Sequence, residues 1–252
     1  MSGTGSPLIG VSLKMYMGLE RTRGWMTELA AMVGTLPLIP YELFVIPSFL
    51  SIGDAVRILD NTGVGVGAQD VFWEDSGAYT GEVSAPMLAE AGCSYVEIGH
   101  AERRALFGET DADVALKVKA SVRAGLVPVL CVGEVVEGDP GAAVDACALQ
   151  LDAALDGIPS DSDLVIAYEP VWAIGAQQPA SPPFIRDVAR GLRQHLASFP
   201  NASLIYGGSA GPGLLGKLEG TVDGLFLGRF AHDIGALHDV LMEAGLAANN
   251  CE

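Results

Sequence analysis

The segment VPVLCVGEVVEGDPGAAVDACALQLDAALDGIPSDSDLVIAY, from Val127 to Tyr168, holds the pattern that decides the fold. It begins and ends with short apolar runs, Val127 to Val132 and Leu164 to Tyr168, and a helical pattern lies between them from Ala142 to Leu155. Runs rich in Val, Ile and Leu indicate strands that are buried on both faces, as in a parallel sheet. The segment therefore predicts one strand–helix–strand unit.

The same alternation recurs along the chain. Six further apolar runs have the length of buried strands: Ile9 to Leu13, Leu43 to Ile46, Val64 to Gln69, Tyr95 to Ile98, Leu204 to Tyr206 and Gly224 to Leu227. Further helical patterns lie at Thr22 to Val33, Asp111 to Ala124, Phe184 to Leu196 and Leu237 to Ala244. Eight strand–helix units in 252 residues, with no linker between them, fit a closed (β/α)₈ barrel better than an open doubly wound sheet. We expect one α/β domain over residues 1–252.

The composition excludes several classes of protein. Half of the residues are hydrophobic and 18% are charged, which excludes collagen, coiled coil and intrinsic disorder. The net charge of −17 repels a phosphate backbone, so we expect no nucleic-acid partner. No apolar window is long enough for a membrane span and the N-terminal residues lack a signal-peptide pattern, so we expect no membrane partner and a cytoplasmic location.

The cysteines show no pattern of a metal site or a redox pair. Cys93, Cys131, Cys147 and Cys251 form no C-x-x-C motif and have no metal-ligand spacing, which fits a reducing compartment. We interpret Cys93 and Cys147 as packing residues.

Ionisable side chains follow three of the predicted strands. Lys14 follows the first strand, His100 the fourth and Glu169 the sixth. In a (β/α)₈ barrel, the loops after the strands build the functional site. Glycine-rich loops, Gly207-Gly208-Ser209 and Gly228-Arg229, follow the last two strands, where this fold binds phosphate on backbone N–H groups. The sequence therefore predicts an anion site beside an acid–base set.

Each of these residues also has a simpler interpretation. Lys14 alone fits a solvated rim charge, His100 the start of a surface helix, and Glu169 an exposed loop carboxylate, while paired glycines are common turn residues. Their joint placement favours the functional interpretation. The remaining histidines lie in predicted helices or their flanks and are interpreted as structural: His195, His232 and His238.

The chain resembles the triosephosphate isomerase family along nearly its whole length. The matching motifs are Leu13-Lys14-Met15, Gly77-Ala78-Tyr79-Thr80-Gly81-Glu82, Glu97-Ile98-Gly99-His100-Ala101-Glu102-Arg103-Arg104, Cys131-Val132-Gly133-Glu134, Ala167-Tyr168-Glu169-Pro170-Val171-Trp172-Ala173-Ile174-Gly175 and Tyr206-Gly207-Gly208-Ser209. The resemblance implies a TIM barrel and an isomerase.

The resemblance also implies roles for the matching residues. Glu169 would be the base that moves a proton between adjacent carbons, His100 the electrophile that polarises the carbonyl, and Lys14 a cation near the substrate oxygens, as is known for this family. Glu102 resembles the carboxylate beside that lysine, although a carboxylate at a helix N-terminus is also favoured by the helix dipole. No metal and no cofactor are expected, because His100 and Lys14 supply the polarisation.

The phosphate site and a lid follow from the same resemblance. Gly175, Gly208, Ser209 and Gly228 would bind the substrate. The segment Pro170-Val171-Trp172-Ala173-Ile174-Gly175-Ala176 would close over it as an apolar lid. Such a lid excludes water, which protects an enediolate from losing its neighbouring phosphate.

Four departures from the family lie close to these residues. Ser12 stands where the family has Asn, and Ala101 stands where it has Ser, so both side chains are smaller. The lid ends in Ala176-Gln177-Gln178 in place of Thr-Gly-Lys. Arg229 replaces a glycine after the last strand; it either offers a guanidinium to the substrate or points away and pairs with an acidic residue at the rim. We expect Ser12 and Arg229 to bind substrate.

Three features, Gly228 followed by Arg229, Ser12 before the lysine, and Trp73, resemble the branch of the family that contains L-erythrulose-1-phosphate isomerases. The substrate of that branch is dihydroxyacetone phosphate with one hydroxymethyl group added at the carbon that loses its proton, so the pocket must be larger. The resemblance implies interconversion of L-erythrulose 1-phosphate and D-erythrulose 4-phosphate. Two alternatives remain: a triosephosphate isomerase acting on dihydroxyacetone phosphate and glyceraldehyde 3-phosphate, or an inactive barrel that binds a sugar phosphate.

The segment from Gln69 to Glu82 predicts an assembly. It is long, and it carries Phe72, Trp73 and Tyr79, which is a large apolar surface for a free loop. In the family this loop inserts beside the catalytic lysine of a partner, so the resemblance implies a homodimer. The alternative is that the aromatic side chains fold back on their own barrel.

Overall fold

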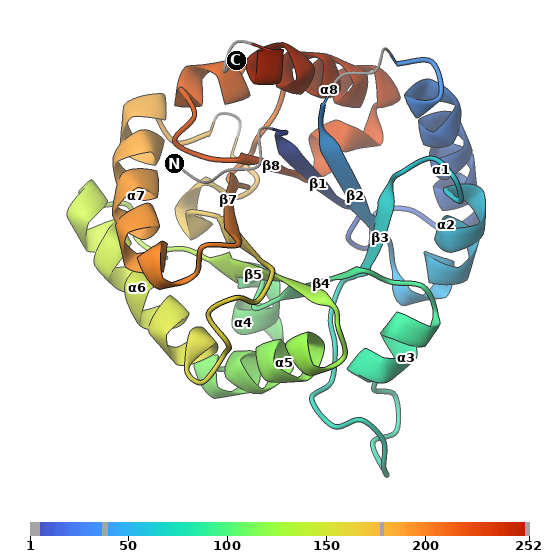
Figure 1. The fold of residues 1–252 in the computed structure, drawn as a ribbon, viewed down its shortest axis with the longest axis horizontal. Coiled ribbons are helices and arrows are strands. Elements are labelled where there is room, and N and C mark those ends of the chain that lie inside the picture. The colour runs from blue at the N-terminus through green and yellow to red at the C-terminus, as the bar shows by residue number, and fades with distance from the viewer. Residues whose placement is uncertain (1–5, 37–39, 177–178, 250–252) are drawn as a thin grey trace.

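A closed barrel of parallel strands lies at the centre of the molecule (Figure 1). The computed structural model describes residues 6–36, 40–176 and 179–249. Within these residues the strands are β1 (Leu8–Ser12), β2 (Glu42–Ile46), β3 (Gly65–Ala68), β4 (Tyr95–Ile98), β5 (Val127–Val132), β6 (Leu164–Tyr168), β7 (Ala202–Tyr206) and β8 (Gly224–Leu227). Each pairs with the next in parallel, and β8 pairs with β1, so the sheet has no edge. The predicted (β/α)₈ barrel is confirmed.

Helices surround the barrel on its outer side (Figure 1). Their bounds are α1 (Leu19–Val33), α2 (Ile52–Ile58), α3 (Ala85–Glu90), α4 (Ala101–Phe107), α5 (Asp111–Arg123), α6 (Pro140–Leu155), α7 (Pro182–His195) and α8 (Ile234–Asn249). The five longer helices match the predicted ones with shifted ends. The helices α2 and α3 were not predicted, because one or two turns are too short for a helical period to stand out in a sequence. No helix of the described residues is long and apolar enough to cross a membrane.

Side chains of the strands alternate between two cores. In β1, Ile9 and Val11 pack outward against the helices, while Leu8 packs inside the barrel. This alternation follows from the period of two in a strand. By the same alternation Ser12 points inward at the carboxyl end of β1. At the carboxyl ends of the strands, the barrel interior therefore carries the polar side chain of Ser12 next to the apolar inner core.

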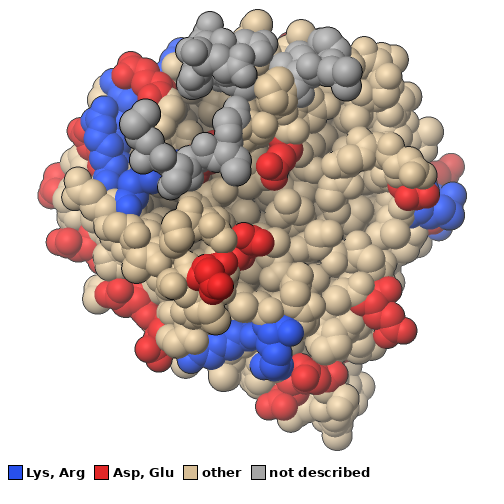
Figure 2. Space-filling model, viewed as in Figure 1, with Lys and Arg blue, Asp and Glu red and all other residues tan. Residues whose placement is uncertain are grey.

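Charged side chains lie mainly on the surface. Figure 2 shows carboxylates spread around the rim of one face, with the Lys and Arg side chains gathered in a few clusters beside them. Exposed ion pairs of this kind contribute little stability each. Because the basic clusters are few and separate and the net charge is −17, most of this face has no basic surface that would attract a polyanion.

Candidate active site

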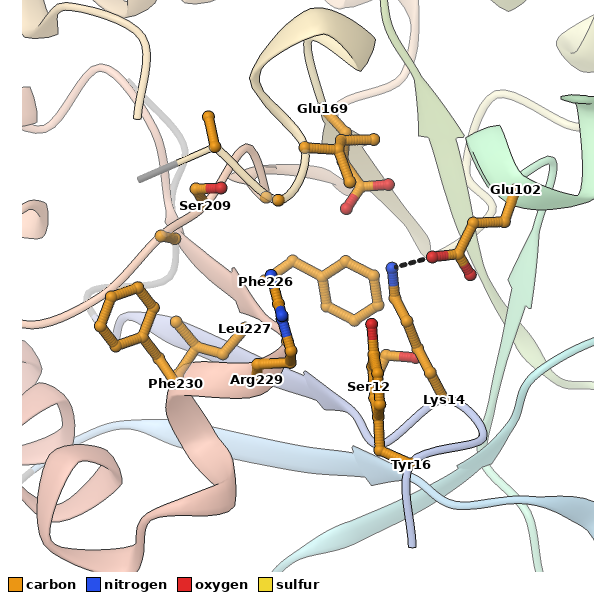
Figure 3. A pocket seen from close by; sticks show the side chains of 16 residues that line it. Ser12, Lys14, Tyr16, Glu102, Glu169, Ser209, Phe226, Leu227, Arg229 and Phe230 are labelled. Atoms are coloured by element: carbon orange, nitrogen blue, oxygen red, sulfur yellow. Dashed lines mark hydrogen bonds and ion pairs between the residues drawn. The ribbon is translucent and has the colours of Figure 1, made fainter. Parts of the chain in front are cut away.

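A cavity of about 580 Å³ opens at the carboxyl ends of the strands (Figure 3). Its size is that of a site for a small molecule. The predicted site residues that line it are Ser12, Lys14, Glu102, Glu169, Gly175, Ser209, Gly228 and Arg229. The side chains that sequence reasoning did not place in the site are Tyr16, Ala210, Phe226, Leu227 and Phe230. The cavity therefore brings together residues from β1, α4 and β8 and from the loops after β1, β6, β7 and β8.

Lys14 is held at the end of β1 as a paired cation. Its backbone has φ of 48°, in the left-handed region that residues other than glycine rarely adopt. Its Nζ donates a hydrogen bond to Glu102 Oε1 over 3.0 Å (Figure 3). Burial alone lowers the pKa of Lys14, but the carboxylates of Glu169 and Glu102 outweigh burial and raise this pKa above its ordinary value. The ammonium group is therefore charged at neutral pH.

His100 caps the N-terminus of α4 with its own ring. The backbone N–H of Glu102 donates to His100 Nδ1 over 3.1 Å. A ring nitrogen that accepts a hydrogen bond carries no proton, so this bond assigns a neutral imidazole with its proton on Nε2. Nε2 lies 3.1 Å from Lys14 Nζ and 3.4 Å from Glu169 Oε2, two groups that line the cavity.

Glu169 follows β6 and is 6% exposed. Its Oε2 is buried and accepts no hydrogen bond from the described residues, which leaves this oxygen free to take a proton. Two glycines make room for the residue. A Cβ at Gly207 would lie 2.6 Å from Glu169 Oε1, and a Cβ at Gly133 would lie 1.9 Å from its carbonyl oxygen.

Glu169 and Lys14 line the cavity, and the buried His100 contacts both of them through Nε2, so a base, an N–H donor and a cation meet at this place. The distances from His100 Nε2 to its two neighbours place all three groups within reach of the same small ligand. An unpaired carboxylate oxygen can remove a proton from carbon. A neutral imidazole N–H beside an ammonium group can stabilise the oxygen anion that this removal creates.

The loops after β7 and β8 form the opposite wall. Ser209 and Gly228 line the cavity, whereas Gly208 lies beside it, where a Cβ would be 2.5 Å from Tyr206 Oη. Arg229 points into the cavity (Figure 3). Its guanidinium carbon lies 5.9 Å from the centre of the Tyr16 ring. Of the two orientations that the sequence left open, the structure shows the one toward the cavity.

The segment after Glu169 forms one side of the cavity, as expected of a lid. A single 3₁₀ turn spans Val171–Ala173, and Ile174, Gly175 and Ala176 line the cavity. Trp172 Nε1 donates to Glu134 Oε1 over 2.7 Å, and Ser209 Oγ donates to the carbonyl oxygen of Ala173 over 2.8 Å. These two bonds tie the start of the segment to the loops after β5 and β7. The predicted end of the lid at Gln177 and Gln178 lies outside the described residues.

Sequence reasoning missed two carboxylates near the site. Glu134 was quoted only as part of a motif, yet it holds Trp172 and accepts from Tyr168 Oη over 3.2 Å. Glu97 lies inside the barrel, and Ser12 Oγ donates to its Oε2 over 2.7 Å. A signal existed for Glu97, because a carboxylate in the middle of an apolar strand is rarely buried without a partner.

The other histidines and two of the cysteines lie where they were expected. His195 pairs with Asp152 on the surface, and His238 is exposed beside Asp239. His232 packs edge-on against the Tyr16 ring, with centroids 5.5 Å apart. Cys93 and Cys147 are buried in the outer core, and Cys251 lies outside the described residues.

The loop between β3 and α3 projects from the barrel (Figure 1). Its aromatic side chains pack on one another, with the Phe72 ring centre 4.2 Å from that of Trp73 and 4.6 Å from that of Tyr79. Phe72 and Trp73 are half-buried, while Tyr79 remains 44% exposed. A buried ion pair anchors the base of the loop, because Lys117 Nζ of α5 donates to Asp70 Oδ1 over 2.6 Å.

Comparison with known proteins identifies the family. A family model described as triosephosphate isomerase matches residues 7–244. An L-erythrulose-1-phosphate isomerase of Pectobacterium atrosepticum is 50% identical over 245 residues, which are 94% of this chain and 95% of that protein. The L-erythrulose-1-phosphate isomerase of Rhizobium etli is 39% identical (95% and 92% covered), and the triosephosphate isomerase of Moorella thermoacetica is 41% identical (88% and 92%). The chain therefore belongs to the triosephosphate isomerase family of isomerases.

Proposed function

We propose that the chain is a cofactor-independent sugar-phosphate isomerase that moves a carbonyl between adjacent carbons through an enediolate. The observation that carries this proposal is the convergence of an unpaired buried carboxylate, a neutral imidazole N–H and an ammonium group, from Glu169, His100 and Lys14. A protein that only binds a sugar phosphate needs the cation and the glycine loops. It has no use for an unpaired base.

The residues divide the reaction between them. Glu169 Oε2 takes the proton from the carbon next to the carbonyl, and the electron pair moves to form the enediolate. His100 Nε2–H and the Lys14 ammonium group stabilise the negative oxygen. Glu169 then returns its proton to the neighbouring carbon, while the hydroxyl proton of the first carbon passes to the oxygen of the second through His100. Glu102 holds Lys14 in place over 3.0 Å.

We propose L-erythrulose 1-phosphate and D-erythrulose 4-phosphate as the preferred substrate pair. Ser12 and Ala101 are smaller than the residues of the resembled family, which leaves room for an added hydroxymethyl group. Arg229, directed into the cavity, supplies a guanidinium group for the phosphate or a hydroxyl at the wall formed by Gly228 and Ser209. Two of the relatives described above bear the name of this isomerase. Gly175 and Gly208 would offer backbone around the same phosphate.

The test is a comparison of specificity constants on two substrates. The purified chain is assayed with L-erythrulose 1-phosphate and with dihydroxyacetone phosphate, beside Glu169→Gln purified in the same way to measure any isomerase from the host. We expect kcat/KM to be higher for the four-carbon substrate. A higher value for dihydroxyacetone phosphate would favour a triosephosphate isomerase, and binding of both without turnover would favour an inactive barrel.

We also propose a homodimer formed through the loop from Gln69 to Glu82. Tyr79 stays 44% exposed at the end of this loop, and Met15, next to Lys14, is 94% exposed. A partner's loop lying over Met15 would cover both apolar surfaces and would complete the site beside Lys14. Light scattering at micromolar concentration should give twice the mass of the chain. A monomer with full activity would contradict the proposal.

A further inference from the structure

Glu97 is a carboxylate placed inside the barrel, below the cavity. Its neighbours in β4 alternate as a strand requires: Val96 and Ile98 belong to the outer core, while Tyr95 packs against the inner one. The Glu97 side chain therefore enters the barrel interior, where it is 3% exposed. Apolar side chains such as Ile46 and Phe226 form the inner core of the barrel around it.

The Glu97 side chain is connected to the cavity through Ser12. Ser12 Oγ donates its proton to Glu97 Oε2 over 2.7 Å, and Ser12 lines the cavity two residues before Lys14 (Figure 3). A hydroxyl group has one proton and two lone pairs. Because the proton is used by Glu97, the Ser12 oxygen presents only lone pairs to a bound molecule. The cavity wall at Ser12 is thus a hydrogen-bond acceptor.

We propose that Glu97 is a positioning residue that fixes Ser12 as the acceptor for a substrate hydroxyl. The inference rests on the proposed four-carbon substrate, whose added hydroxymethyl group supplies a hydroxyl proton that dihydroxyacetone phosphate lacks. A substrate hydroxyl group can donate a hydrogen bond to the Ser12 oxygen, whereas a carbonyl or phosphate oxygen cannot accept one from it. Glu97 thereby favours the longer polyol phosphate without touching it.

A packing role does not account for Glu97. A carboxylate buried in an apolar layer destabilises the fold unless its interactions compensate for the lost hydration. Burial raises the pKa of Glu97, and the nearby Glu169 raises it further, against the opposing effects of Ser12 and Lys14. An apolar side chain of the same length would fill the space with no such penalty. What such a side chain could not provide is the acceptor for the hydrogen bond from Ser12 Oγ.

The test is a mutant cycle read as a ratio of specificity constants, the kcat/KM for L-erythrulose 1-phosphate divided by that for dihydroxyacetone phosphate. Ser12→Ala and Glu97→Met should each lower this ratio by about two- to twelve-fold, the value of one neutral hydrogen bond. The double variant should be no lower than Ser12→Ala, because the two residues act as one unit. Glu97→Gln should keep most of the ratio, since its amide oxygen still accepts from Ser12.

Tyr95→Phe is the matched control. Tyr95 lies two residues before Glu97 on the same inner face of β4. The substitution removes its hydroxyl oxygen, which lies at a distance from the cavity. The ratio of the two specificity constants should be the same in Tyr95→Phe as in the parent enzyme.

The outcomes separate this inference from the proposed function. An unchanged ratio in Glu97→Met, or additive losses in the double variant, would overturn the role of Glu97 while the parent enzyme still prefers the four-carbon substrate. A parent enzyme that does not turn over L-erythrulose 1-phosphate would overturn the proposed substrate and, with it, this inference.

Discussion

Shortening Glu169 by one methylene, in Glu169→Asp, is expected to impair the chemical step much more than substrate binding. In the structure, Oε2 lies 3.4 Å from His100 Nε2, at the wall where the reacting carbon must lie. Aspartate withdraws the carboxylate by about one C–C bond, roughly 1.5 Å. Gly207 lies against the Glu169 side chain and Gly133 lies against its backbone carbonyl, and neither has a side chain that could fill the space that aspartate leaves.

The size of the effect follows from the geometry. A displacement of about 1 Å costs on the order of a hundredfold in rate, and a general base contributes about 10²- to 10⁴-fold in total. We therefore expect kcat to fall by about 10²- to 10³-fold, about 3 to 4 kcal/mol in the barrier. KM should change by less than about threefold, because the carboxylate gives little ground-state binding.

The assay is a steady-state measurement of kcat and KM with L-erythrulose 1-phosphate, accompanied by circular dichroism to show that the variant is folded. Glu28→Asp, the same chemical change on the exposed side of α1, is the matched control and should leave both constants unchanged. A Glu169→Asp variant with the turnover of the parent would refute Glu169 as the base.

Three further predictions concern other parts of the site and the fold. Arg229→Gly should weaken binding of the four-carbon substrate by about ten- to a hundredfold through loss of a charge-assisted hydrogen bond; a ratio of specificity constants within about twofold of the parent would remove Arg229 from the site. Burial raises the pKa of Glu97 in the folded protein above the pKa of about 4.3 that glutamate has in an unfolded chain. The folded state therefore loses stability as the pH rises above about 4.3. Glu97→Gln does not ionise, so its melting temperature should exceed that of the parent by more at pH 8 than at pH 4; a constant difference would contradict this. Burial raises the pKa of Cys93 to about 11 and that of Cys147 to about 12. Neither thiol should therefore react with iodoacetamide at pH 8 until urea unfolds the chain, and rapid labelling of Cys93 or Cys147 in the native protein, located by peptide mass mapping, would refute it.

The strands could be predicted from the sequence because their burial on both faces leaves apolar runs that stand out. Four strands, β4, β5, β6 and β8, have the predicted bounds. The ends of the other four differ by one or two residues, as at β7, which begins at Ala202 and not at Leu204. The positions of Lys14, His100 and Glu169 followed from the same runs, because each residue comes one or two positions after the end of a strand. A barrel closes those strand ends into one ring, so residues far apart in the sequence meet.

Side-chain direction could not be predicted in the same way. Two orientations of Arg229 fit the sequence equally well, and the choice depends on packing against Tyr16. Glu97 was hidden within a strand because its partner, Ser12, is 85 residues away. The neutral form of His100 depends on a backbone N–H at the start of α4, which no residue type reveals.

The most direct test of the central claim is proton exchange at the reacting carbon. L-Erythrulose 1-phosphate is incubated with the chain in D₂O and followed by proton NMR, with Glu169→Gln as the blank. The account predicts that the proton on the carbon next to the carbonyl is replaced by deuterium while the signals of D-erythrulose 4-phosphate appear. Binding of the sugar phosphate with its carbon-bound proton fully retained would contradict it.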